Sequence, residues 1–334
     1  MAQVYNKIFD EEKWGKVNKE NKAIIDDYIM ELKAQKKSQG TIKQYFNDLR
    51  IVAIYVLEMC DNRSFIELNR KDFRRFVLWL TDDLGVSNAR ANRLMSAVRT
   101  LLSYLEDDDD YDYDVSQAQK IKGLKKEEVR EIQFLDNDTI LALYDKFMKE
   151  EKWQFAMLLG LLYDSGARKN EVAQVRRDSI QPDKHSTNIV IGKRGKKFAL
   201  TVFRLSQTAF EKYNEWRGKD NCESLFITGH GETARPATSG TIYSWVVSWR
   251  KDLKELTGED IPINVHTFRH SYINNFLNSK DPKKCHYLIT ELGLGDVPLE
   301  KIKVLVHHES SDTTLHYAEN NEDKEIEDLF GIKL

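Results

Sequence analysis

The amino-acid sequence predicts a mainly α-helical protein with one small β-hairpin, divided into two domains. Three observations support this prediction. Apolar residues recur at helical spacing through residues 21–106, a second helical region begins near Gln133, and two short strand-like runs flank a basic turn at residues 193–196. The chain has 334 residues, which is enough to bury two separate cores. We therefore expect an N-terminal four-helix bundle followed by a mixed α+β domain.

The first domain is expected at residues 21–106, after an extension at residues 1–20. Apolar side chains recur here every three or four residues in four successive stretches, which indicates four helices that each bury one face. The four stripes are Ile24, Ile25, Tyr28, Ile29 and Leu32; Ile42, Tyr45, Phe46, Leu49 and Val56; Phe73, Phe76, Val77 and Leu80; and Ala91, Leu94, Met95, Val98, Leu101, Leu102 and Leu105.

A charged linker is expected at residues 107–132. The acidic run at residues 106–114 holds seven acidic side chains, no basic side chain and no apolar period, and lysines follow it at positions 120, 122, 125 and 126. Such a segment repels itself and lacks the apolar side chains that would build a core. We therefore expect the second domain to begin beyond it.

The second domain is expected at residues 133–317, and most of it should be helical. A helix cap at residues 135–138 precedes the first apolar stretch, and a strongly apolar helix carries the chain toward Arg168. Lys193 is expected at the turn of a β-hairpin. The predicted elements are a helix through Ile140, Leu141, Leu143 and Tyr144, an apolar helix at Trp153–Tyr163, and strands at Asn188–Ile191 and Phe198–Phe203.

The charge of the chain is unevenly distributed. Its formal net charge is −3, yet residues 106–114 contribute −7 and residues 318–334 contribute −4, so the remaining residues carry +8. A basic excess of this kind is compatible with a surface that binds phosphates, although it is a common property of proteins.

Cysteine usage and hydropathy disfavour several classes of protein. Cys60, Cys222 and Cys285 are far apart in the sequence and form no Cys-x-x-Cys pair, which disfavours a structural zinc site and a disulfide framework. No stretch approaches the ~20 apolar residues that a membrane span requires. We therefore expect a cytoplasmic protein without membrane association.

Four short segments of the second half carry chemically suggestive side chains. They are Ser165–Arg168, Ile191–Lys193, His266–His270, and the pair formed by His308 and Tyr317. Together they supply two arginines, a lysine, histidines and one phenol, without an acidic cluster that would hold a metal. Guanidinium groups match phosphate geometry through paired hydrogen bonds, and fixed cations stabilise the extra charge of a phosphoryl transition state. This set suits attack by a tyrosine on a phosphodiester.

The order and spacing of these segments resemble the tyrosine recombinases, also called phage integrases. The matching patterns are Gly-Ala-Arg-x-x-Glu ending at Glu171, Ile-Gly-Lys ending at Lys193, His-x-x-Arg-His at residues 266–270, and His-x8-Tyr ending at Tyr317. The N-terminal helices resemble the core-binding bundle of that family, whose Thr-x-x-x-Tyr-x-x-x-Leu pattern is present at Thr41, Tyr45 and Leu49. The resemblance extends over nearly the whole chain.

The resemblance implies how the scissile phosphate would be bound. Arg168 and Arg269 would hold its non-bridging oxygens, and His308 would assist from a third side, although the neighbouring His307 could take that role. Glu171 lies three residues after Arg168 and would brace its guanidinium by an ion pair. No metal ion and no cofactor are implied.

The resemblance also implies the groups that move protons and form the covalent bond. Tyr317 would attack and become a 3′-phosphotyrosine, which retains the energy of the phosphodiester so that rejoining needs no nucleotide. His266 would be the acid–base group, with His270 supporting it, and Lys193 would protonate the departing 5′-hydroxyl. Lys193 could act in this way at neutral pH only if burial or nearby arginines lowered its pKa.

Double-stranded recombination sites are the implied partner. A homotetramer on two duplexes would exchange strands through a Holliday junction, and the free protein would be a monomer or a weak oligomer, associated with the nucleoid when bound to DNA. Basic side chains on the bundle and the hairpin are candidates for phosphate contacts. They are Lys43, Arg50, Arg90, Arg93, Arg99, Lys196 and Lys197.

The sequence departs from the family pattern at three places. Asn170 stands where a small residue is usual, His307 stands where a glycine usually precedes the catalytic histidine, and the connection at residues 278–298 is longer than usual. Residues 1–20 are too short for the arm-DNA-binding domain of some integrases, so a simple two-domain recombinase is expected. Residues 318–334 are expected to form a tail whose short helix docks on a neighbouring subunit.

Two other classes of function are compatible with these residues. A relaxing topoisomerase or a hairpin telomere resolvase would use the same chemistry, and a two-site plasmid assay for excision or inversion separates these enzymes from a recombinase. A DNA-binding regulator without catalysis is the second alternative. The complete set of candidate catalytic residues disfavours it.

Overall fold

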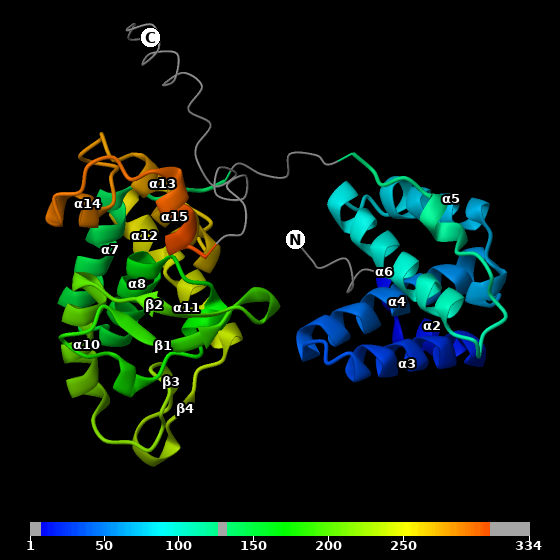
Figure 1. Cartoon of the computed structure of the whole chain (residues 1–334), viewed down its shortest axis with the longest axis horizontal. Coiled ribbons are helices and arrows are strands. Elements are labelled where there is room, and N and C mark those ends of the chain that lie inside the picture. Colours follow the sequence, from blue (N-terminus) through cyan, green and yellow to red (C-terminus); the bar gives the residue numbers. More distant parts are fainter. Residues whose placement is uncertain (1–7, 126–131, 308–334) are drawn as a thin grey trace, which may run out of the picture. The chain divides into compact units, whose positions relative to one another are not determined.

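The computed structural model describes residues 8–125 and 132–307, and the chain divides into two compact units (Figure 1). The first unit is Met1–Val129 and the second is Arg130–Leu334. Among the described residues both units are mainly helical, and the β-strands form two antiparallel two-stranded sheets. The predicted fold class is confirmed.

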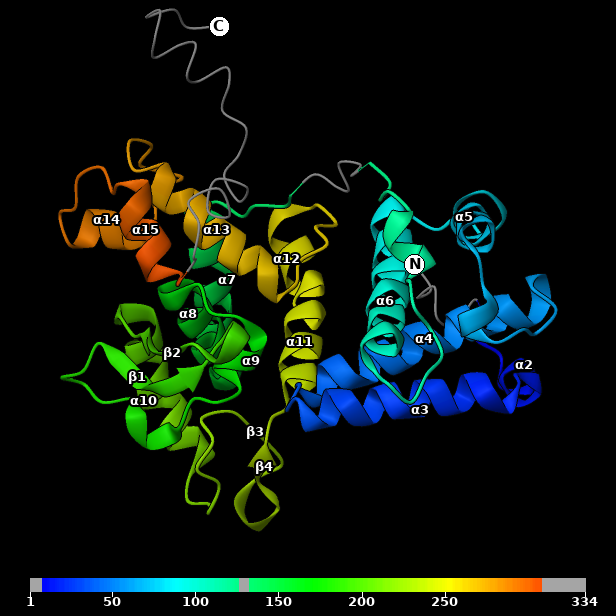
Figure 2. The ribbon, with the colours of Figure 1, turned by 45° about the vertical axis from the view of Figure 1, so that its right-hand side comes forward.

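The first unit contains the four predicted helices and a shorter one before them. Helix α2 (Glu11–Lys16) lies in the segment expected to be an extension, and Asp10 caps it by accepting a hydrogen bond from the Lys13 backbone. Helices α3 and α4 pack along each other (Figure 2). The predicted helices are α3 (Lys19–Ala34), α4 (Gln39–Met59), α5 (Arg70–Leu78) and α6 (Asn88–Asp107).

Side-chain caps and apolar faces explain these helices. Asn18, Ser38 and Asn69 each accept a hydrogen bond from a backbone N–H in the first turn of α3, α4 and α5. Most residues of the predicted stripes are buried, Leu49 and Leu94 completely, and Tyr45, Phe46 and Val77 are partly buried against the same core. Burying a side chain of this size contributes ~1.5–3 kcal/mol, so the packed stripes stabilise the bundle far more than helix propensity does.

Part of the segment expected to be a charged linker packs against the bundle. Tyr113, Ala118 and Ile121 are buried in the core of the first unit. Arg99 on α6 donates hydrogen bonds to the carbonyl oxygens of Ala118 and Ile121, at 3.3 and 2.7 Å. The few apolar residues within and after the acidic run therefore attach this part of the chain to the first unit.

The second unit surrounds helix α8 (Trp153–Ser165), which is buried at every residue from Ala156 to Ser165. The hairpin is present as strands β1 and β2, which pair Val190 with Phe198. A second sheet of two-residue strands was not predicted. The other elements are α7 (Asn137–Lys149), α9 (Lys169–Val172), β1 (Ser186–Ile191), β2 (Lys197–Thr201), α10 (Arg204–Arg217), β3 (Ile227–Thr228), β4 (Arg235–Pro236), α11 (Ser239–Ser248), α12 (Arg250–Thr257), α13 (Val265–Leu277), α14 (Tyr287–Glu291) and α15 (Leu299–Leu305).

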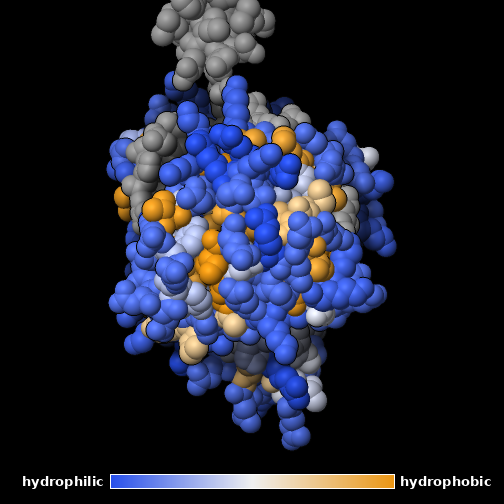
Figure 3. Space-filling model, turned by 90° about the vertical axis from the view of Figure 1, so that its right-hand side faces the viewer, coloured by the Kyte–Doolittle hydropathy of each residue, from blue (hydrophilic) through white to orange (hydrophobic). Residues whose placement is uncertain are grey.

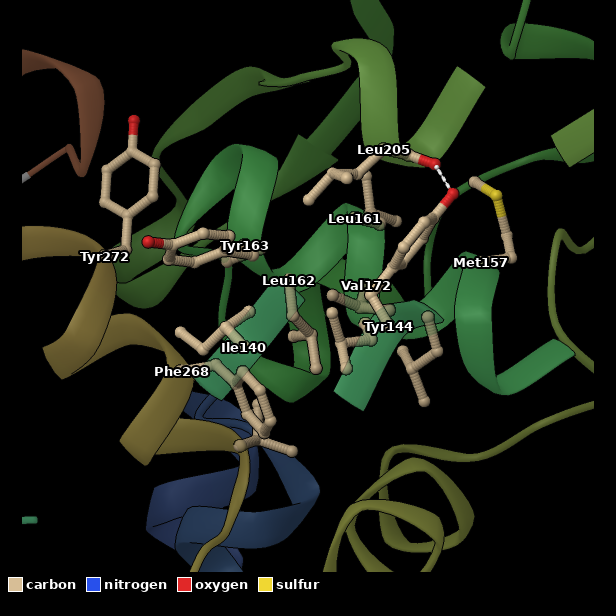
Figure 4. Close-up of a cluster of buried hydrophobic side chains, with 14 of the residues drawn as sticks. Ile140, Tyr144, Met157, Leu161, Leu162, Tyr163, Val172, Leu205, Phe268 and Tyr272 are labelled. Carbon is tan, nitrogen blue, oxygen red and sulfur yellow. Dashed lines mark hydrogen bonds between the residues drawn. The ribbon is translucent and has the colours of Figure 1, made fainter. Parts of the chain in front are cut away.

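Helix α8 packs closely against α7, α10 and α13. Gly160 makes the approach to α10 possible, because a Cβ at this position would lie 2.8–2.9 Å from the backbone of Leu205 and Ser206. At the same contact the Tyr144 hydroxyl donates a 2.8 Å hydrogen bond to the Leu205 carbonyl oxygen (Figure 4). The helix that precedes Arg168 is thus held by protein on all sides.

The longer connection at residues 278–298 contributes to the core of the second unit. His286 and Tyr287 are buried, and the Tyr287 hydroxyl donates to Asp164 at 2.6 Å. Asp164 also accepts from the hydroxyl and the backbone N–H of Ser206. The connection therefore anchors α14 to α8 and α10 instead of forming a peripheral loop.

The surface of the molecule shown in Figure 3 is dominated by hydrophilic side chains, with hydrophobic ones scattered among them. Within residues 8–125 and 132–307, no helix is long and apolar enough to cross a membrane.

Candidate active site

A left-handed glycine directs the chain from α8 to Arg168. Helix α8 ends at Gly166, whose φ is +59°, and a Cβ there would lie 2.9 Å from the ring of Tyr272. Glycine is required on both grounds, because L side chains rarely adopt this φ and no space exists for one. Arg168 follows as the residue before α9.

Glu171 holds Arg168 through two hydrogen bonds. Its carboxylate accepts from the Arg168 backbone N–H at 2.8 Å and from Nη1 of the guanidinium at 3.0 Å. The Glu171 side chain is 3% exposed, whereas that of Arg168 is 27% exposed. The arrangement fixes one edge of the guanidinium against buried protein and leaves part of the group accessible, as binding of an anion requires.

Arg269 on α13 is almost completely buried and joins three parts of the second unit. Its Nη1 donates to the Gly166 carbonyl oxygen at 2.7 Å, and its Nη2 donates to the Val306 carbonyl oxygen at 2.5 Å. The first bond ties Arg269 to the turn that carries Arg168. The second ties it to the residue that follows α15.

His266 lies one helical turn before Arg269 on α13, where Asn264 caps the helix. His266 as a whole is exposed. Even so, burial of part of its ring lowers the pKa of the imidazole, and the positive charges of Arg269 and Arg168 lower this pKa further. These influences favour a neutral imidazole that can accept a proton at neutral pH. The ring of His270 lies 6.3 Å from that of His266.

Lys193 lies in the exposed turn between β1 and β2. Arg194 and Gly195 both have left-handed backbone conformations, with φ of +60° and +76°, and the Gly192 N–H donates to the Lys196 carbonyl oxygen at 2.7 Å. A Cβ at Gly192 would lie 3.3 Å from Oε1 of Glu171. The base of the hairpin therefore adjoins the carboxylate that holds Arg168.

His307 ends the described part of the chain in a left-handed conformation, with φ of +56°. Glycine, which the family resemblance leads us to expect at this position, adopts this backbone region more readily than histidine does. The His307 ring stacks on Phe198 with centroids 3.8 Å apart, and its burial lowers its pKa. His308 and Tyr317 lie outside the described residues.

Sequence reasoning did not find Phe198, Tyr272 or Lys169 as neighbours of the site. Lys169 lies 5.2 Å from the ring of Tyr243, and its charge contributes to the lowered pKa of His266. In the sequence, only the position of Lys169 next to Arg168 indicated that it would lie near the site. Phe198 and Tyr272 occupy ordinary apolar positions in the sequence, so no signal distinguished them from other core residues.

Two of the basic residues that were expected to contact DNA form ion pairs with a buried carboxylate in the first unit. Arg90 and Arg93 on α6 form ion pairs with Asp48 on α4, at 2.7 and 3.2 Å. The Asp48 side chain is 3% exposed, and the Arg93 side chain is 45% exposed. Asp48 thus holds one edge of the Arg93 guanidinium, while part of the side chain remains accessible to solvent.

The remaining expected DNA contacts differ in their surroundings. The Arg50 guanidinium lies 3.7 Å from the ring centre of Phe9 and forms an ion pair with Glu11. Arg99 bonds backbone carbonyls, as described above, and burial lowers its pKa. Lys43, Lys196 and Lys197 are exposed. Among residues 8–125 and 132–307, no three His, Cys, Asp or Glu side chains are grouped so that they could hold a metal ion.

Comparison with known proteins matches both units. Residues 133–288 match the phage integrase family, and residues 25–108 match the phage integrase N-terminal SAM-like domain. Tyrosine recombinase XerD of Listeria innocua is 26% identical over 299 residues, covering 84% of this chain and 92% of its own. A probable integrase/recombinase protein of Methanocaldococcus jannaschii is 22% identical over 315 residues, covering 89% and 87%.

Solved structures show the same fold at low sequence identity. The Tn1549 transposon integrase in complex with transposon right end DNA superposes with a TM-score of 0.67 at 12% identity, covering 92% of this chain and 99% of that one. A lambda integrase tetramer bound to a Holliday junction gives 0.65 at 16% identity, covering 90% and 77%. The chain belongs to the tyrosine recombinase, or phage integrase, family. It is a tyrosine-type site-specific recombinase, an enzyme that breaks and rejoins DNA.

Proposed function

We propose that the protein exchanges DNA strands between two recombination sites through a 3′-phosphotyrosyl intermediate at Tyr317 and a Holliday junction. The arrangement of Arg168 and Arg269 carries the proposal. Arg269 bonds the Gly166 carbonyl oxygen, two residues before Arg168, so the two guanidinium groups belong to one rigid constellation. Two such groups bind the non-bridging oxygens of a phosphate and stabilise its transition-state charge.

The proton transfers are assigned to His266 and Lys193. The lowered pKa of His266 suits a group that takes the proton of an attacking phenol near neutral pH. Lys193 is an exposed ammonium on a turn whose base lies near Glu171, so a bound duplex would complete its surroundings. Lys193 would then donate a proton to the departing 5′-hydroxyl oxygen while Tyr317 forms the new bond to phosphorus.

Assembly on DNA is proposed to follow that of the structural relatives. The lambda integrase structure is a tetramer on a Holliday junction, and a XerH recombinase structure holds a palindromic difH substrate in a post-cleavage complex. A homotetramer that pairs two duplexes accounts for exchange between sites. The first unit, with Arg93 and Lys43 at its surface, would contact DNA phosphates together with the hairpin lysines.

Covalent trapping tests this proposal. A nicked suicide substrate should yield a protein–DNA adduct in denaturing electrophoresis with wild-type protein in excess EDTA, because side-chain cations stabilise the charge. Tyr317→Phe should abolish the adduct and keep site binding, because only the attacking oxygen is lost. A surviving adduct would assign the nucleophile elsewhere, and strict dependence of cleavage on Mg²⁺ would contradict the mechanism. On a two-site plasmid, relaxation without excision or inversion would indicate a topoisomerase.

A further inference from the structure

The backbone at the end of α15 is strained at a position next to the proposed site. His307 has φ of +56°, a region that favours glycine, although histidine enters it more often than most side chains. The preceding residue is fixed, because Arg269 bonds the Val306 carbonyl oxygen. A side chain retained at such a position points to a contribution that glycine could not make.

That contribution is a ring contact with the hairpin. The His307 imidazole stacks on Phe198 with centroids 3.8 Å apart and an interplanar angle of 29°. Phe198 belongs to β2 and pairs with Val190 of β1 across the hairpin. The contact therefore connects the end of α15 to the strand that follows the Lys193 turn.

Phe198 also reaches the residue before Lys193. A Cβ at Gly192 would lie 2.6 Å from Cε1 of the Phe198 ring and 3.0 Å from its Cζ, so the ring rests directly on the Gly192 backbone. The same Cβ would lie 3.3 Å from Glu171, which holds Arg168. One aromatic ring thus touches both His307 and the first residue of the Lys193 turn.

The two ends of this contact differ in how firmly they are held. On one side, Arg269 is buried and bonds both Gly166 and Val306. On the other side, residues 193–197 are all exposed, and the turn is closed by hydrogen bonds within the hairpin. The stack of His307 on Phe198 is therefore a contact through which the buried site can restrict the movement of the exposed turn.

We propose that His307 is a positioning residue that stacks on Phe198 to hold the β1–β2 hairpin, and with it Lys193, against the phosphate-binding site. The inference rests on the proposed role of Lys193 as the acid for the leaving group. His307 itself does not touch the reacting atoms in this role. A neutral imidazole suits stacking on an apolar ring, and burial favours that form of His307.

Three substitutions of His307 separate the effect of its ring from the effect of its left-handed backbone. His307→Gly and His307→Asn accept the left-handed backbone but lack the stacking ring, whereas His307→Phe keeps a ring of similar size. Each variant is assayed under single-turnover conditions on ordinary DNA and on DNA with a 5′-bridging phosphorothiolate, whose leaving group needs little protonation. Lys193→Ala is assayed beside them, and thermal unfolding verifies that all are folded.

We expect His307→Gly and His307→Asn to cleave ordinary DNA about 3- to 10-fold more slowly, the range that an aromatic pair supports, and the phosphorothiolate at nearly the wild-type rate. His307→Phe should restore most of the rate on ordinary DNA. In a Lys193→Ala background, His307→Gly should cause little further loss, because the acid it positions is already absent. Unfolding midpoints of the Gly and Asn variants should equal or exceed that of the wild type.

The outcomes distinguish this inference from the function on which it rests. If Lys193→Ala is rescued by the phosphorothiolate but His307→Gly is equally slow on both substrates, the positioning role is overturned while the acid role stands. Unchanged rates for the Gly and Asn variants overturn it as well. If Lys193→Ala itself is not rescued, the acid role fails and the inference fails with it.

Discussion

Arg269 donates a 2.7 Å hydrogen bond to the carbonyl oxygen of Gly166, a residue 103 positions earlier in the chain. Gly166 stands two residues before Arg168. This bond therefore fixes the Arg269 guanidinium relative to the backbone that carries Arg168. A hydrogen bond to a charged group contributes ~1.5–3 kcal/mol, and the second bond to Val306 adds another of this kind. The geometry proposed to bind the phosphate is therefore largely formed in the free protein, as transition-state stabilisation requires.

Glu171→Gln is expected to slow cleavage about 10- to 100-fold, the range that corresponds to one charge-assisted hydrogen bond. Glutamine keeps the shape of the side chain but offers one acceptor oxygen, so the Arg168 backbone and guanidinium can no longer both be held. Single-turnover cleavage of a suicide substrate measures the rate. Glu255→Gln is the matched control, because Glu255 pairs only at the surface with Lys146, and it should react at the wild-type rate. Equal rates for both variants would contradict the bracing role.

Gly192→Ala is expected to slow cleavage of ordinary DNA while leaving the protein folded. The φ of −88° suits alanine, so the effect would come from the added Cβ, which would approach the Phe198 ring to 2.6 Å and Oε1 of Glu171 to 3.3 Å. Displacing the ring should cost ~1–3 kcal/mol of stability, as overpacking usually does. Gly15→Ala provides the control, because nothing lies within 4 Å of its Cβ. Thermal unfolding and cleavage assays on the two variants check the prediction, and a normal cleavage rate for Gly192→Ala would show that the Phe198 contact is dispensable.

The helices of both units could be predicted because their apolar period is a local property of the sequence. The stripe of α6 and the apolar run of α8 show this, and so does the hairpin around Lys193. Residues 107–132 were harder to interpret. Their charge indicated a linker, whereas Tyr113, Ala118 and Ile121 pack on the bundle, and these residues are too sparse in the sequence to form an apolar pattern.

The candidate site was predictable mainly as a set of residue types. The motifs indicated Arg168, His266 and Arg269, and the spacing also indicated the ion pair of Arg168 with Glu171. They did not indicate the bonds of Arg269 to Gly166 and Val306, or the stacking of His307 on Phe198. These partners act through backbone carbonyl oxygens or an ordinary aromatic ring, and neither has a signature in the sequence. His307 gave one usable signal in the sequence, because it stands where the family resemblance places a glycine. Its backbone is left-handed in the structure.

His286 is expected to make the second unit sensitive to acid. The ring is buried, donates from Nε2 to the Tyr163 carbonyl oxygen at 2.8 Å, and stacks on Phe276; burial lowers its pKa to about 3. Because the folded pKa lies below the unfolded value near 6.5, the unfolded state binds the proton first as pH falls. The resulting stability is fully present above pH ~6.5 and is lost progressively toward pH ~3.

The loss should amount to about 2 kcal/mol between pH 7.5 and pH 5. Denaturant unfolding of wild type and His286→Gln at several pH values measures it, since glutamine keeps a donor and an acceptor but does not titrate. The difference between the two stability curves should slope over this interval, with wild type losing its advantage as pH falls. A flat difference would contradict the lowered pKa, because it would show that His286 binds a proton as readily in the folded protein as in the unfolded chain.

The acidic tail at residues 318–334 is expected to be needed for assembly and not for binding to one site. It lies outside the described residues, so the prediction depends on sequence alone. Ile326, Leu329 and Phe330 stand at i, i+3 and i+4, which indicates a short amphipathic helix whose apolar face is too small to be stable alone in water. We propose that this face docks on a neighbouring subunit, while its acidic residues keep the tail off DNA by repulsion.

Truncation after Asn321 should leave the affinity for a single site within about twofold of wild type, because the removed residues carry negative charge and offer DNA no attraction. Paired-site complexes and recombination should be lost, since docking of each tail contributes to every interface of the assembly. Native gel electrophoresis with one-site and two-site DNA measures both properties. Replacing Glu322 and Asp323 by Gln and Asn is the control, because it alters the charge but keeps the apolar face, and it should still assemble. If the truncated protein forms paired-site complexes at the wild-type concentration, the tail does not dock between subunits, and the acidic residues then have only an electrostatic role.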